Sequence, residues 1–170
     1  MIERNTSEEI FDVVDEHDCV IGSATRSEVH ARGLLHRAVN IFVLNSQGQL
    51  LLQKRTAIKD QYPLCYTSSA SGHVDAGETY DEAARRELEE ELGLKTDIDF
   101  LQKFPAGPET ANEHSALYLT VTDEPPTFDP FEIEAGAFYE LQTIADWIEK
   151  TPEEFTPPFR VLFDWFVRNR

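Results

Sequence analysis

Cysteine is scarce in this sequence, and its scarcity excludes one class of protein. Only 2 of the 170 residues are cysteine, Cys19 and Cys65, and their separation fits no metal-ligand spacing. A scaffold held by several disulfides and a zinc site built from cysteines are therefore excluded. We expect two buried thiols in a reducing compartment, the cytoplasm.

Positive charge is also scarce. The chain has 15 Lys and Arg against 32 Asp and Glu, which gives a net charge of −17. Nucleic-acid backbones and anionic membrane surfaces are bound by basic patches, so we expect neither as a partner. A small phosphorylated molecule is not excluded, because it needs only a local cation or two and a metal ion.

Long apolar runs are absent as well. No stretch approaches the ~20 apolar residues that a membrane helix requires. The N-terminal stretch MIERNTSEEIF is charged from its start, which is not typical of a secretory signal. An apolar content of 41% is ordinary for a globular protein. We expect a single domain over residues 1–170, present as a monomer or homodimer and without repeats.

The best-defined segment runs from Gly72 to Leu94 and contains a helix. Thr79 and Glu82 have the spacing of a capping box, in which each side chain bonds the other residue's backbone N–H. Residues 81–92 contain no Gly or Pro and consist mostly of good helix formers. Gly93 then supplies a left-handed C-cap. The pattern predicts a helix over residues 81–92 that is capped at both ends.

Three glutamates of this helix share one face. Glu87, Glu90 and Glu91 lie at positions i, i+3 and i+4, where like charges repel. Such a run is most often a solvated surface. A divalent cation would offset the repulsion, because Mg²⁺ prefers carboxylate oxygens. The glycines on either side and the spacing of the whole segment favour the metal site.

The fixed positions of this segment resemble the Nudix box. They are Gly72, Glu78, Arg86, Glu87, Leu88, Glu90, Glu91, Gly93 and Leu94. The resemblance implies a loop–helix–loop that binds Mg²⁺ or Mn²⁺ and cleaves a diphosphate linked to another group. It implies that the metal is held by Glu87, Glu90, Glu91 and the backbone carbonyl of Gly72. It also implies that Glu78, Arg86 and Gly93 hold the motif in shape.

Residues outside the box resemble isopentenyl-diphosphate isomerase, a branch with the Nudix fold. The similarity runs from about Phe11 to about Tyr118 and includes Leu35–Ala38, Gln49–Arg55, Lys59, Pro63 and Ser71–His73. It implies that Arg55 and Lys59 contact a diphosphate and that Glu113 matches a catalytic glutamate. It also implies that His36 and His73 match metal histidines, with His30 one residue short of a third. A histidine on a strand is commonly a structural group instead, so both interpretations of His36 and His73 stay open.

Two positions depart from the isomerase pattern. Ser71 stands where the isomerase has its catalytic cysteine, and a hydroxyl is far less acidic than a thiol. Ala111 stands where the isomerase has a metal-binding glutamate, two residues before Glu113. The chain therefore lacks two residues that the isomerase reaction is expected to need.

We expect a Mg²⁺-dependent Nudix pyrophosphohydrolase that acts on a nucleoside diphosphate derivative or a similar small diphosphate. Glu90 and Glu113 are its expected catalytic residues, with Glu113 as the general base and Glu109 and Glu134 as rivals for that role. The alternatives are an isopentenyl-diphosphate isomerase and a diphosphate-binding module without turnover.

Hydrophobic patterns predict the remaining elements. Strands are expected over residues 11–15, 20–25, 37–45, 49–53, 96–104, 113–121 and 132–139, and further helices over 27–31, 141–150 and from Pro157 onward. We expect an α/β (α+β) fold with a mixed β-sheet between α-helices, which is also the fold that the Nudix resemblance implies.

Overall fold

The computed structural model describes residues 9–170, and most of the charged N-terminal stretch lies outside them. The strands are β1 (Ile10–Val14), β2 (Val20–Thr25), β3 (His36–Leu44), β4 (Leu50–Arg55), β5 (Tyr66–Thr67), β6 (Ala70–His73), β7 (Asp99–Phe104), β8 (Glu113–Val121) and β9 (Ile133–Tyr139). The helices are α1 (Arg26–Arg32), α2 (Tyr80–Leu92), α3 (Leu141–Lys150) and α4 (Pro157–Arg168), with short 3₁₀ turns at Pro108–Thr110 and Pro152–Glu154.

A mixed sheet forms the centre of the molecule, as expected. Its strand order is β5-β4-β3-β8-β7, with β6 paired to β3 and β9 paired to β4. β3 and β8 are parallel, from His36 opposite Glu113 to Leu44 opposite Val121. This register places a histidine and a carboxylate side by side at the start of both strands.

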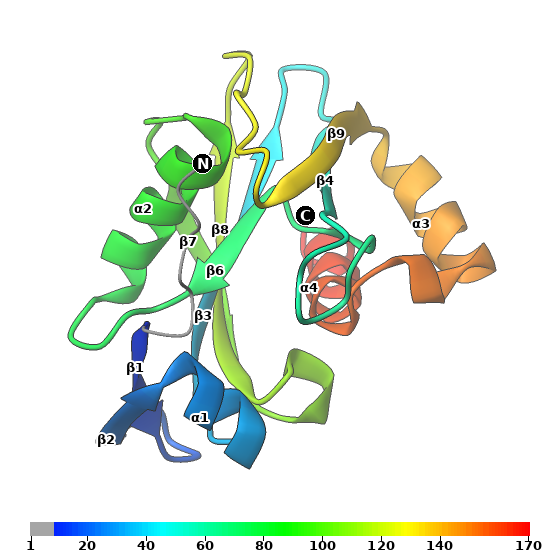
Figure 1. Ribbon diagram of the computed structural model, residues 1–170. Coiled ribbons are helices and arrows are strands. Elements are labelled where there is room, and N and C mark those ends of the chain that lie inside the picture. Colours follow the sequence, from blue (N-terminus) through cyan, green and yellow to red (C-terminus); the bar gives the residue numbers. More distant parts are fainter. Residues whose placement is uncertain (1–8) are drawn as a thin grey trace.

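The sheet forks along one edge of β3. Because β8 occupies the other edge over the whole length of β3, β4 and β6 must share the edge that is left. β6 pairs with the segment Ala38–Ile41, whereas β4 meets β3 only at Leu44. The two strands diverge from there, as Figure 1 shows, and a polar cavity opens between them.

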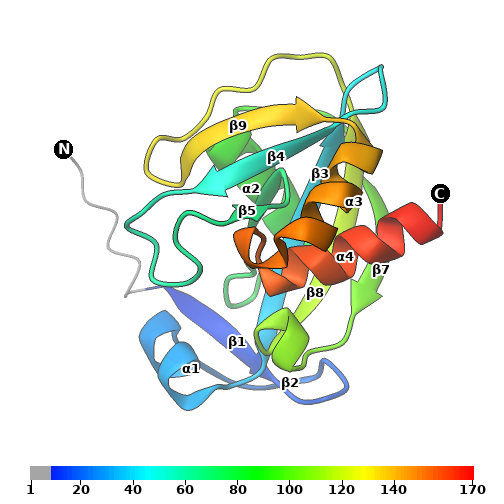
Figure 2. The same ribbon diagram turned by 90° about the vertical axis from the view of Figure 1, so that its right-hand side faces the viewer.

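Helices cover both faces of the sheet (Figures 1 and 2). Successive side chains of β3 point to opposite faces, and the apolar ones on each face need a layer that covers them. Val39, Ile41 and Val43 are buried against α2. Phe42 and Leu44 are buried on the opposite face, in an aromatic cluster with α3 and α4. The continuous apolar run of β3 is thus explained by burial on two faces.

Helix α2 is capped as its sequence predicts. The Thr79 hydroxyl accepts a hydrogen bond from the Glu82 N–H at 3.1 Å, and Glu82 Oε2 accepts one from the Thr79 N–H at 3.0 Å. Gly93 ends the helix at φ 65°. The apolar stripe of α2 lies in the core, and its members are Ala84, Leu88 and Leu92.

The N-terminal hairpin β1–β2 and helix α1 lie beside the start of β3 (Figure 2). Thr25 caps α1, and Gly33 ends it at φ 62°. The helix extends one residue beyond its predicted range at each end. Its residues Arg26 and His30 have their side chains mostly buried.

Some boundaries and one burial prediction differ from expectation. β3 starts at His36 rather than at residue 37, and β9 starts at Ile133, which leaves Glu132 in the preceding loop. The prediction of two buried thiols is wrong, because Cys19 is exposed and Cys65 is half-buried. Cys19 lies in the turn between β1 and β2, where its side chain is exposed to solvent. Within the described residues, every helix is too short or too polar to cross a bilayer.

Candidate active site

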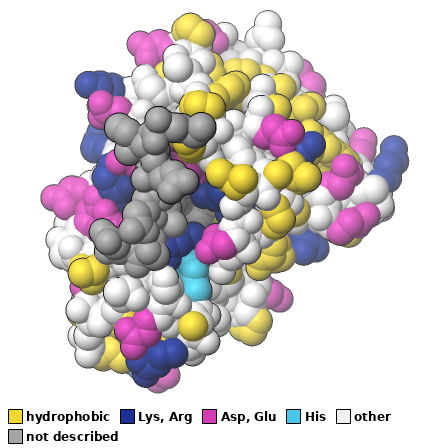
Figure 3. Space-filling model, in the orientation of Figure 1, with side chains coloured by type: hydrophobic (Ala, Val, Ile, Leu, Met, Phe, Trp, Pro, Cys, Tyr) yellow, Lys and Arg dark blue, Asp and Glu magenta, His cyan; other side chains and the backbone are white. Residues whose placement is uncertain are grey.

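The cavity in the fork has a volume of about 340 Å³ and is lined mainly by polar side chains. Most of the residues singled out from the sequence line it together: Arg55, Lys59, Gly72, Arg86, Glu87, Glu90, Glu91 and Glu113. Figure 3 shows Lys and Arg side chains and a histidine gathered near the middle of this face. The rival carboxylates Glu109 and Glu134 are exposed and are not among the lining residues.

Two glutamates of α2 form the acidic wall of the cavity. The Glu91 side chain is buried, and its Oε1 accepts a hydrogen bond from Gln53 Nε2 at 2.7 Å. Burial raises the pKa of Glu91 well above its usual value. Burial likewise raises the pKa of its neighbour Glu87 to about 7. Two neighbouring carboxylates with little access to water favour a proton or a cation between them.

Arg86 ties the acidic wall to the loop before α2. Its Nε donates to Glu78 Oε2 at 2.8 Å, and its Nη1 donates to Glu87 Oε1 at 2.7 Å. Its Nη2 also donates to the His73 carbonyl at 3.0 Å. Glu90 is more exposed and lies 3.3 Å from Arg86 Nη1. Arg86 therefore sets the spacing between the loop, β6 and the carboxylates.

Gly72 leaves the space that the Glu87 carboxylate occupies. A Cβ added at this position would overlap the Cδ and both oxygens of Glu87. Only glycine allows the backbone of β6 and the carboxylate to approach so closely. Buried carboxylate oxygens against an open backbone form a donor set that suits Mg²⁺ or Mn²⁺, so these residues fit a hard divalent cation.

Besides Arg86, three basic side chains border the cavity. Arg55 donates to the Gln61 carbonyl at 3.0 Å, and Lys59 forms an ion pair with Glu132. Arg26 contributes a guanidinium whose Nη2 lies 3.2 Å from Asp60 Oδ1. The sequence offered no signal for Arg26, because it stands alone at the junction of a strand and a helix. Together these cations give the cavity a wall that suits a phosphorylated ligand.

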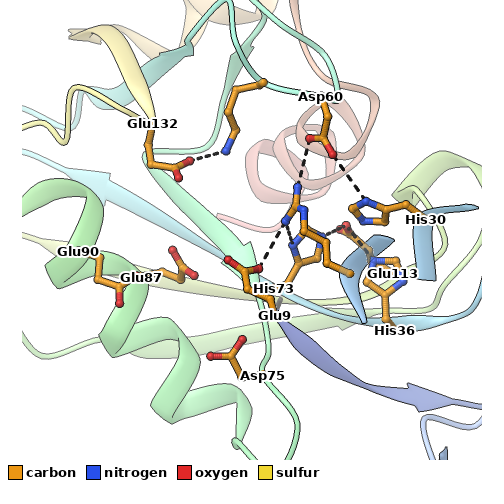
Figure 4. Close-up of polar contacts among 12 residues, drawn as sticks. Glu9, His30, His36, Asp60, His73, Asp75, Glu87, Glu90, Glu113 and Glu132 are labelled. Carbon is orange, nitrogen blue, oxygen red and sulfur yellow. Dashed lines mark hydrogen bonds and ion pairs between the residues drawn. The ribbon is translucent and has the colours of Figure 1, made fainter. Parts of the chain in front are cut away.

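Histidines gather at the opposite end of the cavity (Figure 4). His30, His36 and His73 each offer a ring nitrogen, and these nitrogens lie within 4.8 Å of one another. Glu113 Oε1 lies 3.0 Å from His73 Nε2 and 3.4 Å from His36 Nε2. His30 joins the group despite its short spacing in the sequence, because α1 brings it there.

Hydrogen bonds fix how the histidines present their nitrogens. The Arg26 guanidinium can only donate, so His73 Nδ1 accepts at 3.1 Å and its Nε2–H donates to Glu113. His36 Nδ1 donates to the Leu34 carbonyl at 2.8 Å, which directs its Nε2 towards Glu113. Within residues 9–170, the Nε2 atoms of His30 and His36 are buried without a hydrogen-bond partner.

This histidine cluster, His30, His36 and His73 with Glu113, has the chemistry of a transition-metal site. Imidazole and carboxylate donors suit Mn²⁺ or Zn²⁺. His73 would join such a site only after losing its Nε2 hydrogen. Burial opposes ionisation of Glu113, but the contacts with His36 and His73 outweigh it and lower the pKa of Glu113 to about 2.

Comparisons with known proteins identify the family of the chain. The family model described as NUDIX domain matches residues 34–165. An isopentenyl-diphosphate Delta-isomerase of Serratia proteamaculans is 34% identical over 160 residues, which cover 91% of this chain and 89% of the relative. An uncharacterised Nudix hydrolase of Nostoc is 55% identical over 87 residues, which span 51% of this chain and about half of that relative, 52%.

A solved structure extends the agreement to the fold. The crystal structure of DR0079 from Deinococcus radiodurans superposes with a TM-score of 0.74 at 32% sequence identity, and the match covers 84% of this chain and 90% of that one. The expected fold class is confirmed. The chain belongs to the Nudix family, in a branch that resembles isopentenyl-diphosphate isomerases.

Proposed function

We propose that the protein is a pyrophosphohydrolase that depends on Mg²⁺ or Mn²⁺. The observation that carries this proposal is the pair Glu87 and Glu91, which lines a cavity bordered by Arg55 and Lys59. Glu91 is buried, and the side chain of Glu87 is only 13% exposed. Carboxylates on one side and cations on the other are what a metal–diphosphate complex requires.

The carboxylates of Glu87, Glu90 and Glu91 would hold the cation, together with the backbone carbonyl of Gly72. When bound, the cation makes a water molecule more acidic and neutralises charge on the departing phosphate. Glu78 and Arg86 hold the ligands in place through the hydrogen bonds described above, and Gly93 ends their helix.

Arg55 and Lys59 would bind and orient the diphosphate oxygens. The rest of the cavity favours a hydrophilic second group on the substrate. It is lined by amide and hydroxyl side chains, which are Asn40, Gln53, Thr67 and Thr156. These groups suit the hydrogen-bonding surface of a nucleoside diphosphate derivative better than a hydrocarbon chain.

A single Nudix domain over residues 1–170, active as a monomer or homodimer in the cytoplasm, completes the proposal. Its partner is a small diphosphate, not a nucleic acid or a membrane. The net charge of −17 supports this choice, because it repels large polyanions while local cations and a metal ion attract a small one.

The test is phosphate release from a panel of nucleotide sugars, dinucleotides, nucleoside triphosphates and prenyl diphosphates in the presence of Mg²⁺. We expect Glu91→Gln to lower kcat by about 10²-fold or more, because it removes a charged metal ligand. The matched control is Glu89→Gln, since Glu89 is exposed on the same helix and pairs with Lys95. Equal activity of the Glu91→Gln variant and the wild-type protein would contradict the proposal.

The histidine cluster favours one second candidate, an isopentenyl-diphosphate isomerase. Its imidazole and carboxylate donors match the metal residues that the isomerase resemblance implies. Ser71 weighs against this activity, because it lines the cavity where the isomerase has a thiol. Incubation with isopentenyl diphosphate decides the matter: a dimethylallyl product from the wild-type chain would establish the isomerase.

A further inference from the structure

We propose that Glu132 is the general base of the hydrolytic reaction, and that Lys59 binds its carboxylate until a diphosphate takes the ammonium group away. The inference rests on the proposed function and adds the residue that accepts the proton. Sequence patterns assigned Glu132 to a strand and did not single it out.

Glu132 is fixed at the cavity by its backbone. Its carbonyl accepts a hydrogen bond from the Thr56 N–H at 3.3 Å, and its N–H donates to the Asp129 carbonyl at 3.1 Å. The first bond joins the loop before β9 to the residue after β4, and the second lies within that loop. The side chain is 21% exposed and lines the same cavity as Glu87 and Glu91. A base must be both anchored and open to water, and Glu132 meets both conditions.

Glu132 also lies on the correct side of the cavity. Figure 4 shows it on the same side as Glu87 and Glu90, whereas Glu113 lies with the histidines at the other end. Glu113 Oε1 accepts the hydrogen of His73 Nε2 and lies against His36. Glu132 is also close enough to the metal-binding wall to interact electrostatically with Glu91.

Lys59 gives this carboxylate a partner that the substrate competes for. The ammonium of Lys59 contacts Glu132 Oε2, and both side chains are about one-fifth exposed, 19% and 21%. A carboxylate beside an ammonium is a poorer proton acceptor than one without it. A diphosphate carries more negative charge than a carboxylate and takes Lys59 for itself. The base is thereby released only when a substrate is present.

The step balances as a hydrolysis. An O–H bond of water breaks and its proton passes to the Glu132 carboxylate, while the water oxygen forms a bond to phosphorus. The bridging P–O bond breaks, and its electron pair leaves with the phosphate. Charged groups from three elements act on Glu132: Lys59 in the β4–β5 loop, Arg55 on β4 and Glu91 on α2.

Steady-state kinetics on any substrate from the panel tests the role of Glu132. We expect Glu132→Gln to lower kcat by about 10²–10⁴-fold, the usual contribution of a general base, without raising KM. The acidic limb of the kcat–pH profile should disappear with it, and Glu132→Asp should restore part of kcat. Glu124→Gln, an exposed position in the same loop, is the control and should leave kcat unchanged.

Binding measurements provide a readout that does not depend on turnover. Calorimetric titration with methylenediphosphonate in the absence of metal should show tighter binding to Glu132→Gln than to the wild-type protein. The gain should be about two- to fivefold, the value of a partly exposed ion pair, because Lys59 no longer has to leave a partner. Lys59→Met should bind the probe more weakly than either. Equal affinity of Glu132→Gln and the wild-type protein would overturn the competition for Lys59.

Titration with Mn²⁺ alone separates a base from a metal ligand. The affinity for Mn²⁺ should be the same in Glu132→Gln and the wild-type protein, and a loss of about tenfold or more would make Glu132 a ligand and overturn its role as the base. If Glu132→Gln keeps kcat while Glu91→Gln loses it, the base assignment fails and the hydrolase stands. If the wild-type protein hydrolyses no diphosphate, both fail.

Discussion

At the scale of single residues, Gly72 decides where the Glu87 carboxylate lies. We expect Gly72→Ala to push this carboxylate out of place, because the new methyl group would occupy its position. The affinity for Mn²⁺ should fall by about 10- to 100-fold, as when other groups that orient a metal ligand are altered. Calorimetric titration with Mn²⁺ measures this loss. Gly22→Ala is the matched control, since nothing lies within 4 Å of its added Cβ.

Glu87 and Glu113 should make the stability of the metal-free protein depend on pH in opposite directions. The folded-state pKa of Glu87 is about 7, above the usual 4.5, so the folded protein holds a proton that the unfolded chain has released. The contribution of Glu87 to the free energy of unfolding should therefore fall as the pH rises from about 4.5 to about 7. The pKa of Glu113 is lowered to about 2, so its contribution is present above about 4.5 and is lost as the pH falls towards 2.

Urea unfolding with a chelator present, at several pH values between 2 and 8, would measure both effects. Glu87→Gln should remove the share of the decline above about pH 4.5 that comes from Glu87, leave the share that comes from Glu91, and leave the acid side unchanged. An equal slope of stability against pH between about 4.5 and 7 in Glu87→Gln and the wild-type protein would contradict the assignment of a raised pKa to Glu87.

At the scale of elements, the capping box sets the start of α2 and the phase of its glutamates. We expect Thr79→Ala to lower the free energy of unfolding by about 1 kcal/mol, because the Glu82 N–H loses its acceptor. Urea titration measures the change. Arg85→Ala, at an exposed position of the same helix, should alter stability by less than about 0.5 kcal/mol. A loss as large as that of Thr79→Ala would show that the effect is not specific to the cap.

Elements were predictable from the sequence where the local signals were complete. Helix α2 carries its caps and its apolar stripe in its own residues, and α3 spans its expected range, residues 141–150. β5 and β6 were not predicted, because the polar segment Tyr66–Ser71 has no apolar alternation. The pairing of β6 with β3 is what makes it a strand.

The site was predictable only where one motif contained it. The Nudix box gave Gly72 and the glutamates of α2 in a single segment, and the structure brings them together. Glu132 reaches the cavity from the loop before β9, and Arg26 reaches it from the start of α1. No spacing in the sequence relates either residue to the box. His30 was one residue out of register for a linear comparison, yet the packing of α1 beside the start of β3 places its ring next to that of His36.

At the scale of the whole molecule, MgCl₂ should stabilise the fold more than a salt of the same ionic strength that does not bind. At about 100 times the Kd, a bound ligand adds about 2.7 kcal/mol, which corresponds to a rise in Tm of roughly 5–11 °C for a domain of this size. Thermal unfolding with MgCl₂, and with NaCl at the same ionic strength, measures the difference. NaCl should raise Tm slightly by screening the net charge of −17, and Glu91→Gln should keep only that part. An equal rise with both salts would contradict a specific site.

The divergence of β4 and β6 has a consequence for how a ligand is chosen. β6 is anchored to β3, and β4 is anchored along its outer edge to β9, so neither wall can swing inward without breaking ladder hydrogen bonds. A ligand therefore binds in a cavity of fixed width, and the protein loses little conformational freedom when the ligand binds. Selection among ligands then depends on the side chains at the edge of the cavity, which can exchange partners, while strands β4 and β6 keep their positions.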